Sequence, residues 1–301
     1  MLDASTGAMP VHAADSLARI ESCPLSWRDP KTLALLDRLT GPLVRGVFRF
    51  QLRGVERVPP PPCLFVANHS GVGVVEVMCL FTEWHRLHGE TRPAHGLASD
   101  VIDVLLRPIM RAIGAMPASP ALGLETLRAG RDLLVFPGGE IDCFRPFYAP
   151  RKVEFGSRRG YVRLALESGV PVLPVATIGS HFTYPMFPGG FTLARLLGLK
   201  RFMRAEVVPL PMIPMAGAAL AMRLLARGAE PVVAAALFVA SLLPIPARVT
   251  SEILPPLDVG RLTAHLEESE RVEEGHRIIH GTLQEAVSRL RHDGRTASSV
   301  L

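Results

Sequence analysis

Residues 63–88, CLFVANHSGVGVVEVMCLFTEWHRLH, combine a short apolar run, a polar loop and an apolar stretch with helical spacing. The run Cys63–Ala67 follows four consecutive prolines, which favours a short buried strand. The stretch Val74–His88 repeats apolar residues at intervals typical of a helix. The segment therefore predicts a strand that ends in a loop and continues into a helix, the unit from which α/β folds are built.

The same alternation continues along the chain. Ser119 and Pro120 begin a predicted helix that ends near Gly130, and a second predicted helix covers 157–169. Strands alternating with helices predict an α/β fold with a mixed, mainly parallel sheet flanked by helices. The further predicted strands are Leu133–Phe136, Pro171–Ile178, Ala205–Pro209 and Arg248–Leu254.

The 301 residues predict one domain over 31–301, preceded by a flexible leader over 1–30. The leader carries acidic residues early and lacks a long apolar core, so it does not have the pattern of a secretory signal. From about residue 258 the chain has a charged helical pattern. An apolar stripe on this tail, expected to dock on the sheet, consists of Ile279, Leu283, Ala286, Val287 and Leu290.

Composition and charge limit the classes of partner. Hydrophobic residues make up 48% of the chain, the net charge is +5 and the pI is near 9.4, which favours an anionic partner. With three Tyr and two Trp, the chain has no aromatic platform interleaved with cations for nucleic acid. We therefore expect membrane lipids, and no nucleic acid, as partners.

An apolar insert at about 211–246 also favours contact with a membrane. Arg223, Arg227 and Glu230 divide it, and neither half reaches the roughly 20 residues that span a bilayer. The favoured interpretation is a pair of helices lying in the membrane interface or over a hydrophobic tunnel. A buried core pair and a true membrane span remain the alternatives. The predicted localisation is the cytoplasmic face of a membrane, as a peripheral or monotopic protein.

The four cysteines have no Cys-x-x-Cys spacing, so neither a disulfide framework nor a zinc site is predicted, and a reducing compartment is the default. We expect no metal and no cofactor.

The loop after the first strand carries His69, whose imidazole has a pKa suited to general-base catalysis. Glu76 follows seven residues later, roughly 10 Å along a regular helix, which is too far for a direct hydrogen bond. An irregular start through Gly71 and Gly73 would shorten that gap. The alternative is that His69 caps the helix while Glu76 lies on the surface.

A second loop, Pro137–Glu140, follows another predicted strand. The backbone N–H groups of Gly138 and Gly139 are unobstructed by side chains and could hold a phosphate or an oxyanion. The alternative is a plain turn beside a solvated basic face. Five cations follow within fifteen residues: Arg145, Arg151, Lys152, Arg158 and Arg159.

These motifs resemble the phospholipid/glycerol acyltransferase superfamily over roughly residues 51–259. The Pro-Gly-Gly loop is most similar to the branch that includes diacylglycerol-type acyltransferases. The stretches that carry the resemblance are ANHSG (67–71), IGAMPAS (113–119), AGRDLLVFPGGE (129–140), FGSRRGYVRLALESGVPVLPV (155–175) and ILPPLDV (253–259).

The resemblance implies an O-acyltransferase of lipid metabolism and phospholipid biosynthesis. It would move a fatty acyl group from acyl-CoA or acyl carrier protein to a hydroxyl of a glycerolipid or similar lipid alcohol. It implies that His69 deprotonates the acceptor hydroxyl. The implied substrate-binding residues are Asn68, Gly138, Gly139, Glu140 and Arg145, the last as a contact for an anionic headgroup or donor phosphate.

The chain departs from the family at one position. The family places an aspartate five residues after the histidine, where this chain has Val74. We assign the orienting role to Glu76, with Asp142, Glu140 and Asp100 as substitutes. Two other functions stay open: a non-catalytic lipid-binding protein, and an acyltransferase for a specialised metabolite.

Overall fold

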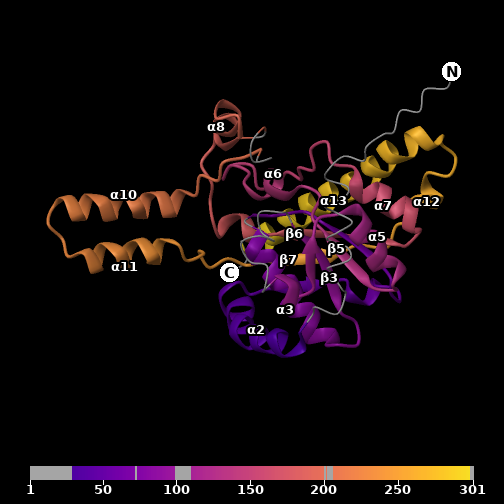
Figure 1. Ribbon diagram of the computed structural model, residues 1–301, viewed down its shortest axis with the longest axis horizontal. Helices are drawn as coiled ribbons and strands as arrows, with labels where there is room; N and C mark the ends of the chain where they lie inside the picture. The colour runs from indigo at the N-terminus through magenta and orange to yellow at the C-terminus, as the bar shows by residue number, and fades with distance from the viewer. Residues whose placement is uncertain (1–28, 72, 99–109, 200, 202–205, 299–301) are drawn as a thin grey trace, which may run out of the picture.

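The computed structural model describes residues 29–71, 73–98, 110–199, 201 and 206–298. One seven-stranded sheet organises this part of the chain (Figure 1), with strand order β1-β7-β6-β2-β5-β3-β4. The strands are β1 (Gln51–Arg53), β2 (Leu64–Ala67), β3 (Ala94–Ala98), β4 (Ala115–Pro117), β5 (Asp132–Val135), β6 (Val172–Ile178) and β7 (Thr250–Ile253).

The sheet is mixed and mainly parallel, as predicted. β2 pairs in parallel with both β5 and β6, and β3 pairs in parallel with β4 and β5. β7 runs antiparallel to β6 and parallel to β1, so these two strands form a reversed edge. Because β2, β5 and β6 are parallel neighbours, their carboxyl ends meet at one edge of the sheet.

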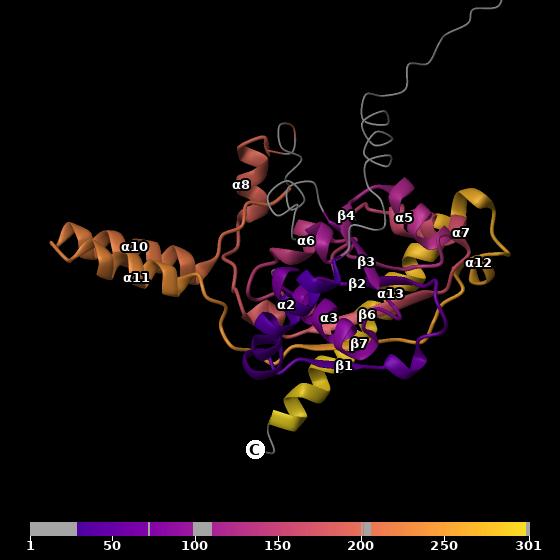
Figure 2. The ribbon, with the colours of Figure 1, turned by 60° about the horizontal axis from the view of Figure 1, so that its bottom comes forward.

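Helices cover both faces of the sheet. On one face lie α5 (Pro120–Arg128), α7 (Gly160–Ser168) and α13 (Glu268–Ser298), and on the other lie α2 (Pro30–Pro42) and α3 (Gly73–His88) (Figure 2). The remaining helices are α6 (Gly139–Cys143), α8 (Gly190–Leu196), α10 (Met212–Ala226), α11 (Pro231–Ser241) and α12 (Val259–Leu262). Short helical turns are Leu43–Val47, Val55–Arg57 and Ser180–Phe182.

Alternation along β2 explains the two cores. Leu64 and Val66 face the core beneath α5, α7 and α13, whereas Phe65 and Ala67 face the core beneath α3. All four are buried, as expected for an inner strand of a sheet covered on both faces. The predicted stripe of α13 docks on the first core, where each of its five residues is buried.

The predicted strand over Ala205–Pro209 is wrong where the structure describes it. Residues 206–209 have no regular structure, and Ala205 lies outside the described residues. This segment precedes a bridge between Met186 and Pro211, so it serves as the link into the apolar insert. Most of the predicted flexible leader, residues 1–28, also lies outside the described residues.

The apolar insert forms a hairpin of two helices. Figures 1 and 2 both show α10 and α11 side by side and projecting away from the sheet. Small residues allow the close approach, since a side chain at Gly217 would meet Ser241. Among the described residues, no helix combines the length and apolar character needed to cross a membrane.

Candidate functional site

Three loops converge where β2, β5 and β6 end. The loop after β2 carries Asn68 and His69, the loop after β5 begins at Phe136, and the turn after β6 carries Ser180. These parallel neighbours bring together residues that are up to 112 positions apart in the sequence. The polar side chains of these loops therefore gather at the carboxyl edge of the sheet.

His69 and Glu76 form a direct pair. The Nδ1 atom of His69 lies 2.6 Å from Glu76 Oε1. Helix α3 begins at Gly73, so Glu76 lies in its first turn, and the residues before it need not follow helical spacing. The gap expected for a regular helix is thereby closed, and a surface position for Glu76 is excluded because the residue is 0% exposed.

The second carboxylate oxygen of Glu76 is also held. The backbone N–H of Ser70 donates to Oε2 at 2.8 Å, and the Ser180 hydroxyl donates to the same oxygen at 2.6 Å. A buried carboxylate needs such donors, since burial without partners is costly. Ser180 was not predicted from sequence, because nothing in its local pattern indicates that β6 would deliver it to Glu76.

The imidazole of His69 is packed as well as paired. Phe136 stacks on it, with ring centroids 4.2 Å apart and an angle of 11° between the planes. Gly71 lets the loop pass close to the next turn, since a Cβ there would lie 2.3 Å from the carbonyl oxygen of Ser180. Phe136 therefore fixes one face of the ring and Glu76 fixes its Nδ1 atom, and Nε2 is the nitrogen turned away from Glu76.

Charge at the site favours the protonated imidazole. Burial alone would lower the pKa of His69, but the side chains of Cys143 and Glu76 raise that pKa well above its usual value. A base with a raised pKa binds a proton strongly once it has accepted one, which suits removal of a proton from a hydroxyl during attack.

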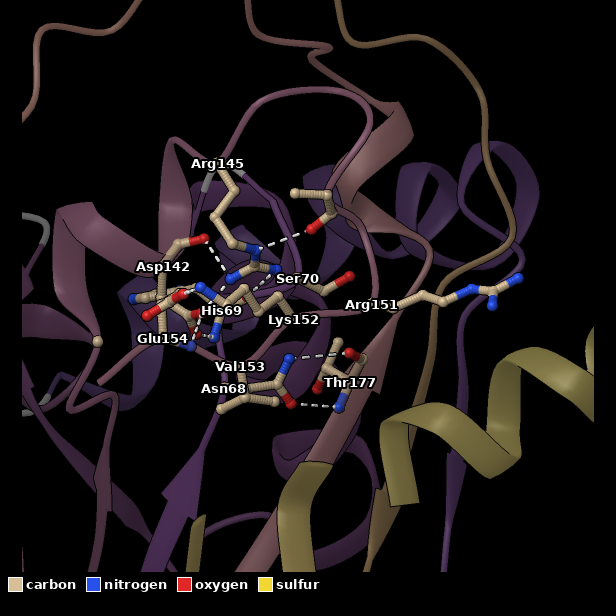
Figure 3. A network of polar contacts seen from close by, with 12 residues as sticks. Asn68, His69, Ser70, Asp142, Arg145, Arg151, Lys152, Val153, Glu154 and Thr177 are labelled. Carbon is tan, nitrogen blue, oxygen red and sulfur yellow. Dashed lines mark hydrogen bonds and ion pairs between the residues drawn. The ribbon is translucent and has the colours of Figure 1, made fainter. Parts of the chain in front are cut away.

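A buried ion pair lies behind the histidine loop. Asp142 accepts a hydrogen bond from the backbone N–H of His69 at 2.6 Å and from that of Glu154 at 2.8 Å. It also pairs with Arg145, whose Nη2 donates to the His69 carbonyl at 3.0 Å (Figure 3). Burial raises the pKa of Asp142 to about 6 against the lowering effect of Arg145. Asp142 thus holds the backbone of the loop, while Glu76 holds the ring.

This arrangement places Arg145 differently from our expectation of a headgroup contact. Its side chain is 3% exposed and donates to the Asp142 carbonyl at 2.7 Å and to the Ala149 carbonyl at 3.3 Å, besides its bond to His69. A guanidinium committed to buried protein atoms has little surface for a ligand. The structure assigns Arg145 the task of supporting the loop.

Asn68 likewise faces the protein. Its amide donates to the Thr177 carbonyl at 3.0 Å and accepts from the Thr177 N–H at 2.8 Å (Figure 3). These two bonds tie the end of β2 to β6 one residue before the histidine. In the structure Asn68 therefore positions the loop that carries His69, and its predicted substrate contact stays a prediction.

The Gly138–Gly139 loop is built for close packing. A Cβ at Gly138 would lie 2.3 Å from the Asp142 Cβ, and Gly139 has φ +47°, which favours glycine. Arg158 donates to the Gly138 carbonyl at 2.5 Å and to Glu140 Oε1 at 2.9 Å. The loop is therefore fixed beside the histidine loop, and the predicted substrate contacts of Gly138, Gly139 and Glu140 stay predictions.

The other predicted cations divide between inward and outward positions. Arg159 pairs with Glu273 at 2.9 Å and Lys152 pairs with Glu154, both near the surface. The Arg151 side chain extends away from the polar network in Figure 3.

Asp100, one of the substitutes considered for the orienting acid, lies outside the described residues. Within the described ranges, no group of three or more His, Cys, Asp or Glu side chains is placed to hold a metal ion.

A buried histidine–carboxylate pair at the carboxyl edge of a mixed α/β sheet is an arrangement that can act as an oriented general base. Residues 49–178, which include this pair, match the family model described as Acyltransferase. The match covers this segment of the chain, and it confirms the resemblance predicted from the motifs.

Curated relatives match slightly more than half of the chain. An uncharacterized Mycobacterium tuberculosis protein is 32% identical over 166 residues, covering 54% of this chain and 46% of the relative. An uncharacterized Mycobacterium leprae protein is 31% identical over 175 residues, covering 57% and 46%. A chicken (Gallus gallus) protein named as a DGAT1/2-independent enzyme synthesizing storage lipids is 28% identical over 173 residues, covering 56% and 48%. The chain thus spans about half the length of these relatives.

The solved structures that match include the 1-acyl-sn-glycerophosphate acyltransferase from Thermotoga maritima. The match covers 84% of this chain and 79% of that chain, with 15% identity and a TM-score of 0.47.

Proposed function

We propose that this protein transfers a fatty acyl group from an acyl thioester to a hydroxyl of a glycerolipid or similar lipid alcohol. The observation that carries the proposal is the 2.6 Å contact between His69 Nδ1 and Glu76 Oε1. It supplies the orienting carboxylate in a chain that has Val74 where the family has its aspartate.

In the proposed reaction, His69 acts through Nε2. With the Nδ1–H donated to Glu76, Nε2 accepts the proton of the acceptor hydroxyl as its oxygen attacks the thioester carbonyl. The C–O bond forms, a tetrahedral oxyanion develops, and the C–S bond then breaks. The proton passes from His69 to the departing thiolate, which leaves as a thiol. Glu76 stabilises the imidazolium between the two steps without itself taking the proton.

The donor in this proposal is acyl-CoA or acyl carrier protein, so no further cofactor is needed. The loop at Gly138 and Gly139 lies beside the base. The Gly139 N–H donates to the Phe136 carbonyl at 3.2 Å, so the Gly138 N–H is the amide proposed for the developing oxyanion. Glu140 pairs with Arg158 and thereby sets the shape of the loop. The chicken relative, named as synthesizing storage lipids, supports a lipid acceptor.

We also propose that the protein works at the cytoplasmic face of a membrane as a peripheral or monotopic protein. The support is the projecting hairpin α10–α11, whose large apolar side chains are exposed over both helices. A helix that is apolar all round is unusual in water and typical of an apolar environment. Each helix is too short to span a bilayer, which favours insertion into the interface.

The test incubates the purified full chain with acyl thioesters of several lengths, as CoA and carrier-protein forms, and with a panel of lipid alcohols. Products are identified by mass spectrometry, with His69→Ala as the control. Ester formation that depends on His69 supports the proposal. An ester only with non-lipid alcohols would favour a specialised metabolite as the acceptor. Lipid binding without any product would favour the non-catalytic lipid-binding function.

A further inference from the structure

Ser180 occupies a position beyond the histidine–carboxylate pair. Its hydroxyl donates to Glu76 Oε2 at 2.6 Å, while the other oxygen of the same carboxylate faces His69. Both Ser180 and Glu76 are fully buried. Solvent therefore does not replace this hydroxyl when it is removed, and the geometry of the carboxylate depends on it.

The turn that carries Ser180 is itself fixed. Gly179 has φ +101° and passes so close to the segment before β7 that a Cβ would lie 1.9 Å from the Arg248 carbonyl oxygen. The Thr183 hydroxyl donates to the Ser180 carbonyl at 2.6 Å and closes the turn. The Ser180 hydroxyl is thus presented to Glu76 by a rigid backbone, which is what a positioning group requires.

We propose that Ser180 is a positioning residue for the acyl transfer described above, acting through Glu76 on His69. The inference rests on the proposed function. With Oε2 anchored by Ser180 and by the Ser70 N–H, the carboxylate plane is fixed and Oε1 stays on Nδ1. Nε2 then faces the acceptor hydroxyl in the tautomer that can take its proton.

Removal of the hydroxyl should loosen the carboxylate rather than remove it. Glu76 would keep the Ser70 N–H but could rotate away from the ring, so His69 would lose part of its orienting contact. Its pKa would fall, because the carboxylate is one of the groups that raise it. The pKa of His69 should therefore change in the same direction as on removal of the Glu76 charge, but by less.

The experiment compares Ser180→Ala, Ser180→Thr and Ser251→Ala with the wild-type full chain. Ser251 is the matched control, a fully buried serine whose hydroxyl lies 2.8 Å from the Thr177 hydroxyl. In Ser180→Ala, kcat should fall roughly 10- to 100-fold with little change in KM, and the acidic limb of the pH–rate profile should move to lower pH. Ser180→Thr, which keeps a hydroxyl, should recover most of the turnover, and Ser251→Ala should retain it.

A second measurement separates this inference from the proposed function. NMR titration of the His69 ring, assigned with a His69→Gln variant, follows its pKa without any turnover. A lower pKa in Ser180→Ala supports the positioning role even if no acyl transfer is found. An unchanged His69 titration, or an unchanged kcat and pH profile in Ser180→Ala, would overturn it.

Discussion

The histidine site and the α10–α11 hairpin both depart from the usual arrangement of polar surface and apolar core, the first by burying charged side chains and the second by exposing apolar ones. At the site, charged side chains are buried: His69 is 8% exposed and Asp142 is 0% exposed. On the hairpin, apolar side chains are exposed: Met222 is 68% exposed and Val232 is 73% exposed. Exposed polar groups and buried apolar groups are common in any folded protein. A buried polar group or an exposed apolar patch is less common and therefore tells more about what a region does.

Burying charge and exposing apolar surface both cost free energy, and the two regions offset that cost differently. Buried charges are tolerated at the site because each has several short hydrogen bonds, so the loop is fixed. The hairpin has no comparable network around its outer surface, and its apolar atoms gain stability only when something covers them. We therefore expect substitutions at the site to change chemistry or folding, and substitutions on the hairpin to change where the protein binds.

The two regions meet at one turn. The backbone N–H of Ile245, on the chain leaving the hairpin, donates to the Thr183 carbonyl at 3.0 Å, and the Tyr184 hydroxyl donates to the Leu242 carbonyl at 2.9 Å. Thr183 also closes the turn that presents Ser180 to Glu76. The base of the hairpin is thus attached to the same segment that supports the site.

The largest effect is expected at the base itself. His69→Ala should lower the rate of acyl transfer by roughly 10²–10⁴, because a positioned general base contributes about that factor. The measurement is kcat with the best thioester and acceptor, accompanied by circular dichroism to check the fold. A well-folded alanine variant with wild-type turnover would remove His69 from the chemistry.

The next effect concerns folding rather than rate. Arg145→Met should destabilise the protein by about 3–5 kcal/mol, because it leaves Asp142 buried without its cation. Urea unfolding measures the change, with Arg159→Met as the control, since its pair with the exposed Glu273 is worth about 0–1 kcal/mol. Equal stability of the two variants would show that Arg145 is not the support that the contacts indicate.

The spacing of apolar residues, together with Ser, Pro and Gly at the ends of elements, was sufficient to predict most of the fold. The apolar runs at β2, β5, β6 and β7 and the capped helices α5 and α7 lie where sequence patterns placed them, within a few residues. The strands β1 and β4 were missed because they are three residues long, too short for a period to register, and β3 was missed because its sequence, AHGLA, lacks a continuous apolar run. The run Ala205–Pro209 has strand-like composition but no neighbouring strand over its described part.

The site was predicted less completely, for a physical reason. His69 and Glu76 are close in sequence, so an irregular helix start was enough to suggest their contact. Asp142 and Ser180 reach the site through the sheet, from 73 and 111 residues beyond His69, and no local pattern encodes that approach. Arg145 was assigned to a ligand because spacing shows that a cation is near the loop but not whether it is buried.

The pair of His69 with Glu76 predicts a particular pH dependence. The base must be neutral to act, and its raised pKa places the acidic limb of kcat above pH 6.5. Cys143 and Glu76 both raise this pKa, and Glu76→Gln removes the contribution of Glu76, so the limb should move to lower pH while the plateau falls roughly 10- to 100-fold. A pH–rate profile of both proteins measures this, and an unmoved limb would contradict the pairing as the cause.

The hairpin should change membrane binding without changing the chemistry. Met222→Glu combined with Val232→Glu places two charges on its exposed surface and should weaken binding to anionic vesicles by roughly tenfold or more. Vesicle co-sedimentation measures the change, with Leu39→Glu on α2 as a control that alters an equally exposed apolar residue on the body. Equal loss in both variants would indicate general surface charge rather than a specific role of the hairpin. Added salt should weaken the preference for anionic over neutral vesicles.

The smallest effect is expected from the same double variant in solution. Met222 and Val232 are already exposed, so replacing them removes little buried area, and the free energy of unfolding should stay within ±0.5 kcal/mol of wild type. Turnover with a short, water-soluble alcohol as acceptor should also be unchanged, because that acceptor reaches His69 without a membrane. Urea unfolding and a vesicle-free assay provide the two measurements. If the double variant instead unfolds early or loses this activity, the hairpin packs against the body or against another chain in solution, and its exposed apolar surface is then part of the folded core rather than a surface for lipid.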